Sequence, residues 1–290
     1  MTAVLLGIAA ALSWGFADFA ARFTGRAVGP TLATLAMLSI SAAAITLYLG
    51  WQGVAVDWRW PSLLLPAVSG FGIAAATLLL YYGLATGPVT IVSPIAGSYP
   101  ALVVGFEVLT GFRPSLAQWC AMAVTLIGVV VVARAGGHFS ESGRFTSAAL
   151  RQATIAAGAA CFMFALGVVA GQQAVPDQGG LGTLWLSRIV SVLVVAGVVA
   201  ARRERPAVPV RWLPLLAAQG LLDGAAYLAI FAGSAGDGAA IVAVVSSAFG
   251  VVTTLLGRLF LDERVTPVQW LGIALVFGGV AVLSGAAGAP

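Results

Sequence analysis

The chain has 290 residues, of which 60% are hydrophobic and only 8% are charged, and its mean hydropathy is +1.03. An average soluble domain is about 25% charged. The composition therefore excludes a soluble globular fold and a disordered chain, and it predicts an integral membrane protein.

Ten apolar runs follow one another along the chain, each about as long as the roughly 20 helical residues that a bilayer requires. Short turns such as Gly87-Pro88 and Pro176–Gly180 separate them. The predicted fold is all-α, with ten transmembrane helices over about 2–22, 29–50, 61–85, 88–110, 115–134, 149–172, 181–201, 212–234, 239–260 and 265–286.

The second half of the chain repeats the first at an offset of 150 or 151 residues. Matching positions include Gly70 with Gly220, Ala75-Ala76 with Ala225-Ala226, and Gln118-Trp119 with Gln269-Trp270. We expect a first repeat over 1–135 (helices 1–5), a connecting loop over 136–148 and a second repeat over 149–286 (helices 6–10). Because five is odd, the second copy enters the membrane from the opposite side. Such a 5+5 inverted-topology repeat is typical of secondary transporters.

The basic residues, all of them arginine, predict the orientation of the chain. The loops on one side contain only Arg59 and Arg113. Because positive loops stay in the cytoplasm, we expect a bacterial inner-membrane protein with both termini outside. The cytoplasmic loops would then hold Arg22, Arg26, Arg134, Arg144, Arg151, Arg202, Arg203, Arg205, Arg211, Arg258 and Arg264.

Three motifs in chain order resemble the EamA-domain proteins of the drug/metabolite transporter superfamily. They are Trp14-Gly15 followed by Arg22, the segment from Tyr81-Tyr82-Gly83 to Tyr99-Pro100, and the closing run Leu261–Gly272. The resemblance covers the whole chain as two EamA repeats. It implies export or exchange of small metabolites through a central cavity lined by helices 1, 3, 4, 6, 8 and 9. Trp14 and Tyr82 are candidate substrate-binding residues on this basis.

Three charged residues within predicted spans are functional candidates, because a charge costs about 2.5–3.5 kcal/mol at a helix centre. Asp18 could instead pair with Arg22 four residues later. Arg188 could extend to the membrane surface or pair with an acid. Asp223, with Tyr227 one turn later, either binds substrate or forms a buried pair with Arg188. If Asp223 binds substrate, Asp223→Asn should abolish transport and leave folding intact.

The fourth predicted helix contains three prolines and Gly97. Each proline removes a backbone donor and frees carbonyls, which a membrane helix tolerates only against protein or a water-filled cavity. We therefore predict a kink facing a cavity, although small residues and proline also occur in ordinary membrane helix packing. The polar wall would comprise Ser93, Ser98 and Tyr99, with Ser246 from the ninth helix.

These features predict a secondary carrier for a small polar or amphipathic metabolite such as an amino acid, which works by alternating access. The alternative is a flippase for a lipid-linked headgroup. The sequence lacks the motifs of hydrolytic enzymes and nucleotide-driven pumps, and its one histidine, His138, lies in a loop. We expect no catalytic residue, cofactor, metal site or nucleic-acid partner. The substrate and the lipid bilayer are the expected partners, and either a monomer or a homodimer is compatible with the sequence.

Overall fold

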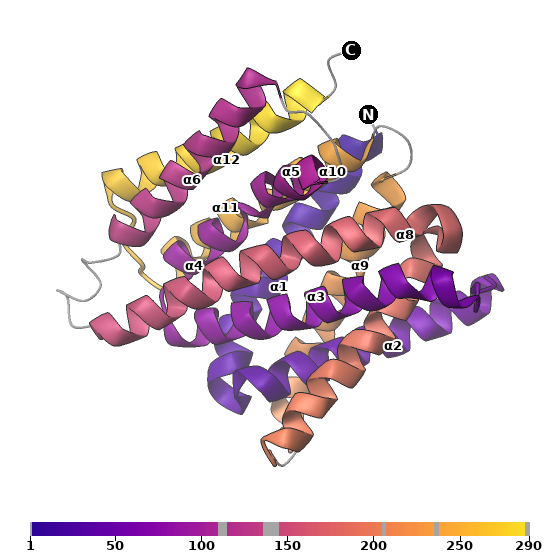
Figure 1. The fold of residues 1–290 in the computed structure, drawn as a ribbon. Coiled ribbons are helices and arrows are strands. Elements are labelled where there is room, and N and C mark those ends of the chain that lie inside the picture. The colour runs from indigo at the N-terminus through magenta and orange to yellow at the C-terminus, as the bar shows by residue number, and fades with distance from the viewer. Residues whose placement is uncertain (1, 110–114, 136–144, 205–206, 235–237, 288–290) are drawn as a thin grey trace.

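The computed structural model describes residues 2–109, 115–135, 145–204, 207–234 and 238–287, and within these ranges every regular element is helical. The elements are α1 (Thr2–Val28), α2 (Pro30–Gln52), α3 (Trp60–Thr86), α4 (Val89–Ala96), α5 (Tyr99–Leu109), α6 (Leu116–Ala135), α8 (Ser147–Ala201), the short 3-10 helix η1 (Val210–Trp212), α9 (Leu213–Gly233), α10 (Gly238–Ser247), α11 (Phe249–Phe260) and α12 (Pro267–Ala287) (Figure 1).

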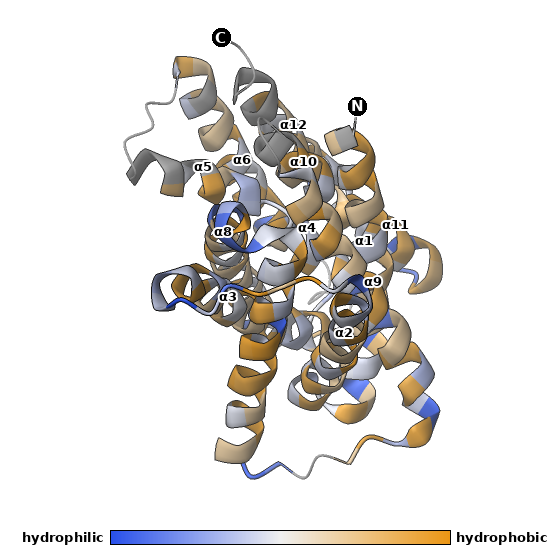
Figure 2. Cartoon of the chain, turned by 90° about the vertical axis from the view of Figure 1, so that its right-hand side faces the viewer, coloured by the Kyte–Doolittle hydropathy of each residue, from blue (hydrophilic) through white to orange (hydrophobic). Residues whose placement is uncertain are grey.

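The helices have the length and composition of membrane spans. In the part of the chain that the structure describes, six helical segments are long and apolar enough to cross a bilayer, and three shorter apolar segments accompany them. Large hydrophobic side chains such as Leu47, Leu193 and Phe260 are exposed on the outer faces. Strongly hydrophilic segments gather at helix ends and connections (Figure 2). An all-helical membrane fold is thus confirmed.

Long helices pack in pairs that join distant parts of the chain. α3 lies along α8, α1 packs on α9, and α6 and α12 form a pair at one edge (Figure 1). Ser191 Oγ on α8 donates to the Gly70 carbonyl on α3 at 2.7 Å. The core therefore lies between helices from the two halves of the chain.

The predicted helix over 88–110 is interrupted as expected. α4 ends at Ala96 and α5 begins at Tyr99, with Pro94 inside α4. The sequence missed a second interruption at Ala248, between α10 and α11, where the chain has no proline. This break lies 150 residues after Ser98, which is the repeat offset.

The two interrupted helices cross each other close to their breaks, and glycine makes this approach possible. A Cβ atom added at Gly97 would lie 3.1 Å from the Ser247 carbonyl, and one at Gly250 would lie 2.8 Å from the Ser93 carbonyl. The backbones are therefore nearly in contact, as small residues permit in membrane proteins.

The predicted turn at Pro176–Gly180 is a sharp bend within α8. Gly179 has a φ of 67°, which glycine adopts without steric cost, and residues on both sides are helical. α8 changes direction at this point (Figure 1). The first predicted span also continues beyond Arg22, to Val28.

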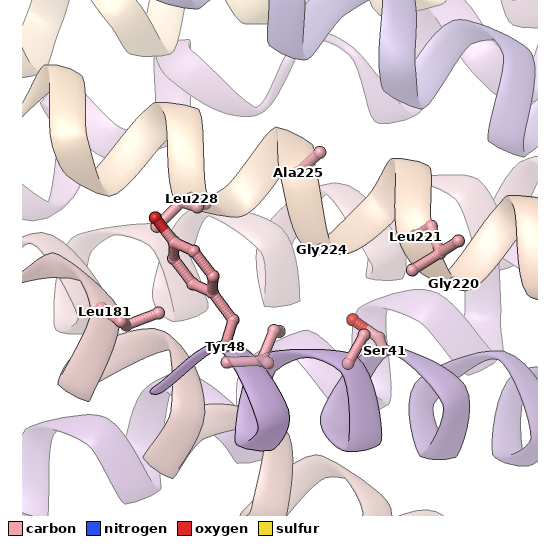
Figure 3. Close-up of a pocket in the computed structure, with 10 residues that line it drawn as sticks. Ser41, Tyr48, Leu181, Gly220, Leu221, Gly224, Ala225 and Leu228 are labelled. Carbon is pink, nitrogen blue, oxygen red and sulfur yellow. The ribbon is translucent and has the colours of Figure 1, made fainter. Parts of the chain in front are cut away.

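α9 approaches α2 through Gly220 and Gly224. Figure 3 shows Ser41 of α2 across from these glycines and Tyr48 pointing toward Leu228, around a cavity of about 160 Å³. A Cβ atom at Gly220 would lie 2.5 Å from the Met37 carbonyl. This four-residue glycine spacing permits close backbone packing and sets the rotation of α9 about its axis.

The close contact predicts that Gly220→Ala destabilises the protein by about 1–3 kcal/mol, because the added methyl group overpacks α2. Unfolding in mixed micelles would measure the change. Gly197→Ala is the control, because a Cβ atom there has no neighbour within 4 Å and alanine favours the helix. Equal stability of the two variants would contradict the packing argument.

Candidate functional site

A buried ion pair lies at the centre of the molecule. Arg188 on α8 is fully buried, and its Nη2 atom lies 2.5 Å from Asp223 Oδ2 on α9. The guanidinium also stacks over the Tyr227 ring, with Cζ 4.6 Å from the centroid. The structure thus confirms the pairing of Arg188 with Asp223, and Arg188 does not extend to the membrane surface.

Trp14 on α1 completes the surroundings of Asp223. Its indole Nε1 donates to Asp223 Oδ1 at 3.0 Å. The same ring makes edge contacts with Tyr227 on α9 and Phe249 on α11, at centroid distances of 4.8 and 5.6 Å. Asp223 is therefore held by α1 and α8 through both carboxylate oxygens.

Asp18 is a second buried carboxylate at this site, on α1 and within electrostatic range of the Asp223 carboxylate. Among the described residues it makes no hydrogen bond or ion pair. The expected alternative of a pair with Arg22 is therefore wrong. A buried carboxylate without a partner is unfavourable in a membrane, so a cationic group brought by a ligand would be stabilised here.

Further polar atoms around the pair also lack partners within the described ranges. They are Nε and Nη1 of Arg188, the Tyr227 hydroxyl and the side-chain carbonyl of Gln219. Buried polar groups are normally satisfied by protein or water. Among the described residues, the two free donors of Arg188 and the Asp18 carboxylate are therefore candidate binding groups for an anion and a cation.

A polar layer at the interrupted helices lies next to this centre. The Tyr99 hydroxyl donates to the Ala243 carbonyl at 3.0 Å and lies 2.9 Å from Ser246 Oγ. Ser98 Oγ lies 3.3 Å from the Cys161 thiol on α8. The Phe164 ring contacts both Tyr99 and Trp14 and joins the layer to the centre.

The structure brings together eight of the ten predicted site residues and leaves Tyr82 and Ser93 apart from them. Tyr82 is 38% exposed and donates to Gln152 Oε1 at 3.1 Å, on the outside of α3. Ser93 is buried where α4 crosses α11, beside Gly250. A role in substrate binding stays a prediction for the eight, which are Trp14, Asp18, Ser98, Tyr99, Arg188, Asp223, Tyr227 and Ser246.

Sequence reasoning missed two neighbours of the site, Tyr81 and Gln219. Gln219 Nε2 donates to the Tyr81 hydroxyl at 3.0 Å and to the Ala17 carbonyl at 3.3 Å. Gln219 is polar and lies one helical turn before Asp223, a signal that the sequence contained. Tyr81 could not be distinguished from Tyr82 until the rotation of α3 was known.

A polar cluster joins the two halves at the end of the molecule where α1 meets α2. We call this the arginine-rich end, because Arg22, Arg26 and Arg202 lie there. Arg22 on α1 donates to the carbonyls of Leu84 and Gly87, where α3 ends. Glu263 accepts the backbone N–H groups of Val89 and Thr90 at 3.1 and 2.9 Å, where α4 begins. A cation at a helix C-terminus and an anion at a helix N-terminus both complement the helix dipole.

A second polar cluster joins the halves at the opposite end. Gln178, beside the bend in α8, donates to the carbonyls of Asp57 and Ser62 at 2.7 and 3.1 Å, and its own carbonyl accepts from the Asp57 N–H. Hydrogen bonds from Arg59 hold the pKa of the Asp57 carboxyl well below its usual range. The centre thus lies between two polar clusters, one at each end.

The sequence profile of the EamA-like transporter family matches residues 1–134 and 152–285. The chain belongs to the EamA-like transporter family. Together with its apolar helices, this membership identifies a multi-pass membrane transporter.

Two further comparisons concern a curated relative and a solved structure. The chain is 34% identical over 99 residues to an uncharacterized transporter in the cobO 3′ region of a Sinorhizobium species, an alignment that covers 33% of this chain and 70% of that protein. A solved crystal structure with 23% sequence identity covers 97% of this chain and 95% of its own, with a TM-score of 0.68. The second comparison concerns the fold alone.

The EamA-like closing run has a physical explanation in this structure. Its Glu263 caps α4, and its Thr266 and Gln269 cap α12. Thr266 N–H donates to Gln269 Oε1 at 3.0 Å, and Gln269 N–H donates to Thr266 Oγ1 at 3.2 Å. This reciprocal arrangement is a capping box, with Pro267 as the first helical residue.

The central ion pair predicts strong coupling between its two residues. Arg188→Leu or Asp223→Leu alone should cost about 3–5 kcal/mol, because each leaves a buried charge unpaired, whereas the double variant should recover most of this loss. For the same reason Asp223→Asn should destabilise the fold, which revises the expectation from sequence. Unfolding in mixed micelles would measure the double-mutant cycle. A double variant no more stable than Asp223→Leu would contradict the pairing.

Proposed function

We propose that this protein is a secondary carrier that exchanges or exports a small zwitterionic metabolite, such as an amino acid, by alternating access. The observation that carries the proposal is the central site, where within the described ranges Arg188 retains two unpaired donors and Asp18 has no partner. A substrate carboxylate would accept from Arg188, and a substrate ammonium group would pair with Asp18. Asp223 would hold Arg188 in place rather than contact the substrate.

Ten spans arranged as two inverted five-helix repeats account for the helix packing. In this arrangement α4 with α5 forms the fourth span, α10 with α11 forms the ninth, and α8 contributes the sixth and seventh. The repeat relates α3 to α9 and α1 to the first half of α8. The contact of α3 with the first half of α8 therefore corresponds to the contact of α9 with α1. Discontinuous helices that cross at a central site are typical of secondary transporters.

The cycle would rock the two halves about the central site. Arg22 and Glu263 close one end of the molecule, and Gln178 with the Asp57 loop closes the other. Opening toward either side requires that one of these clusters separate while the other persists. The arginine-rich end faces the cytoplasm of a bacterial cell in this proposal, and both termini lie outside.

The alternative of a lipid-headgroup flippase receives less support from the central site. A phosphorylated headgroup would favour several free cations, whereas the site has a single arginine that is already paired with Asp223. Arg202 and Arg203 lie at the end of α8, outside the site. One cation and one free carboxylate suit a zwitterion better.

The proposal predicts that Asp18→Asn lowers amino-acid counterflow in proteoliposomes at least tenfold while stability stays near that of the wild type. Stability should persist because Asp18 has no partner among the described residues. The loss should be smaller for N-acetylated amino acids, which lack the ammonium group. Arg134→Gln, an exposed change far from the site, is the control. Unaltered counterflow in Asp18→Asn, or no counterflow of any amino acid by folded wild-type protein, would refute the proposal.

The two end clusters predict opposite changes in access to the centre, and the Cys161 thiol can report them. In a Cys120→Ser background, Glu263→Gln should accelerate labelling of Cys161 by a membrane-impermeant maleimide from the arginine-rich side. Gln178→Ala should accelerate labelling from the other side. Reconstituted protein of known orientation allows each side to be tested separately, with Arg134→Gln as the control. Equal acceleration from both sides would show local unfolding and contradict the rocking model.

A further inference from the structure

A second cavity lies apart from the central site, at the arginine-rich end of the molecule. It has a volume of about 870 Å³ and is formed by the turn between α1 and α2, the C-terminal part of α3 and the end of α8. None of the eight clustered residues of the central site lines it, whereas Tyr82 does. The proposed transport mechanism therefore does not use this cavity.

Two exposed arginines, Arg26 and Arg202, line the cavity, and we call the part that they and Glu204 form its rim. Arg26 Nε donates to the Ala85 carbonyl at 2.9 Å, which anchors the side chain at the end of α3. Arg202 Nη1 donates to Thr31 Oγ1 at 3.3 Å and lies 3.8 Å from Glu204 Oε1. With Glu204 counted, the rim carries one net positive charge, which complements the single negative charge of a phosphodiester.

Part of the cavity lining is apolar. Ala75, Leu78 and Leu79 of α3 and Val198 of α8 form this apolar wall, and none of the four is fully buried. Tyr82 contributes an exposed aromatic ring beside them. Aromatic side chains with one polar end are typical of the membrane interface. The cavity thus combines a cationic rim with a hydrocarbon-like wall.

We propose that this cavity binds a membrane phospholipid. The lipid phosphate would accept hydrogen bonds from Arg26 and Arg202, and one acyl chain would lie along Leu78, Leu79 and Val198. Arginine suits this role because its planar donors match phosphate oxygens. A soluble phosphate compound would satisfy the rim but leave the apolar wall unused. The bound lipid would link the α1–α2 turn to α3 and α8.

Native mass spectrometry of the full-length protein with added dioleoyl-phosphatidylglycerol tests the proposal. The wild type should retain lipid adducts, and the double variant Arg26→Gln/Arg202→Gln should bind the lipid at least tenfold more weakly. Arg211→Gln is the matched control, because Arg211 is exposed, follows Arg202 closely in the sequence and does not line the cavity. Retention by the double variant equal to that of the wild type would overturn the proposal.

A second variant separates lipid binding from loss of structure and from binding of free phosphate. Leu79→Trp fills the apolar wall and keeps both arginines, so it should also weaken lipid binding about tenfold. Glycerol phosphate should neither bind detectably nor compete. Effective competition by glycerol phosphate, wild-type lipid binding in Leu79→Trp, or equal retention of diacylglycerol, which lacks phosphate, would each overturn the proposal. All outcomes are independent of transport activity.

Discussion

The pairing of Arg188 with Asp223 is the constraint on which the rest of the structure depends. Both charges lie in the interior of a membrane protein, where an isolated ion is costly, so α8 and α9 must keep the two groups in contact. Trp14 then fixes α1 to the second carboxylate oxygen, and Tyr227 stacks on the guanidinium. Three helices from both halves of the chain are thereby arranged around one pair. Asp18 has no partner among the described residues, and in the proposed mechanism it would pair with a cationic group of the substrate.

Charged side chains also satisfy backbone groups at the connection between α3 and α4. The end of α3 and the beginning of α4 lie together, and they receive opposite charges from Arg22 and Glu263. Glycines at Gly97 and Gly250 let the two interrupted helices cross with their backbones nearly in contact. Of the two charged side chains, Glu263 comes from the other half of the chain, and it caps the first turn of α4. Such contacts couple the halves at positions that the proposed alternating-access cycle would separate.

Polar groups are distributed along the molecule in three levels. The central level holds the zwitterion-like arrangement of Arg188 and Asp18, and a polar cluster lies at each end. The cavity with Arg26 and Arg202 belongs to the periphery of the arginine-rich end. The charged residues therefore have different contacts, because Arg22 and Glu263 bond backbone groups at one end while Arg188 and Asp223 pair with each other at the centre.

The sequence by itself determined the membrane class, the apolar spans, the repeat and the three intramembrane ionisable residues, because hydropathy and the cost of buried charge are local properties. It also located the kink in the fourth predicted helix, since proline disrupts helical hydrogen bonding wherever it occurs. Only the tertiary structure decided which of these residues meet. It placed Asp18 away from Arg22 because Arg22 bonds the end of α3, and it turned Tyr81 inward and Tyr82 outward through the rotation of α3. The break at Ala248 contains no proline, and packing against α4 accommodates it. Glu263 caps α4 from a distant part of the chain, a contact that only the tertiary structure decides.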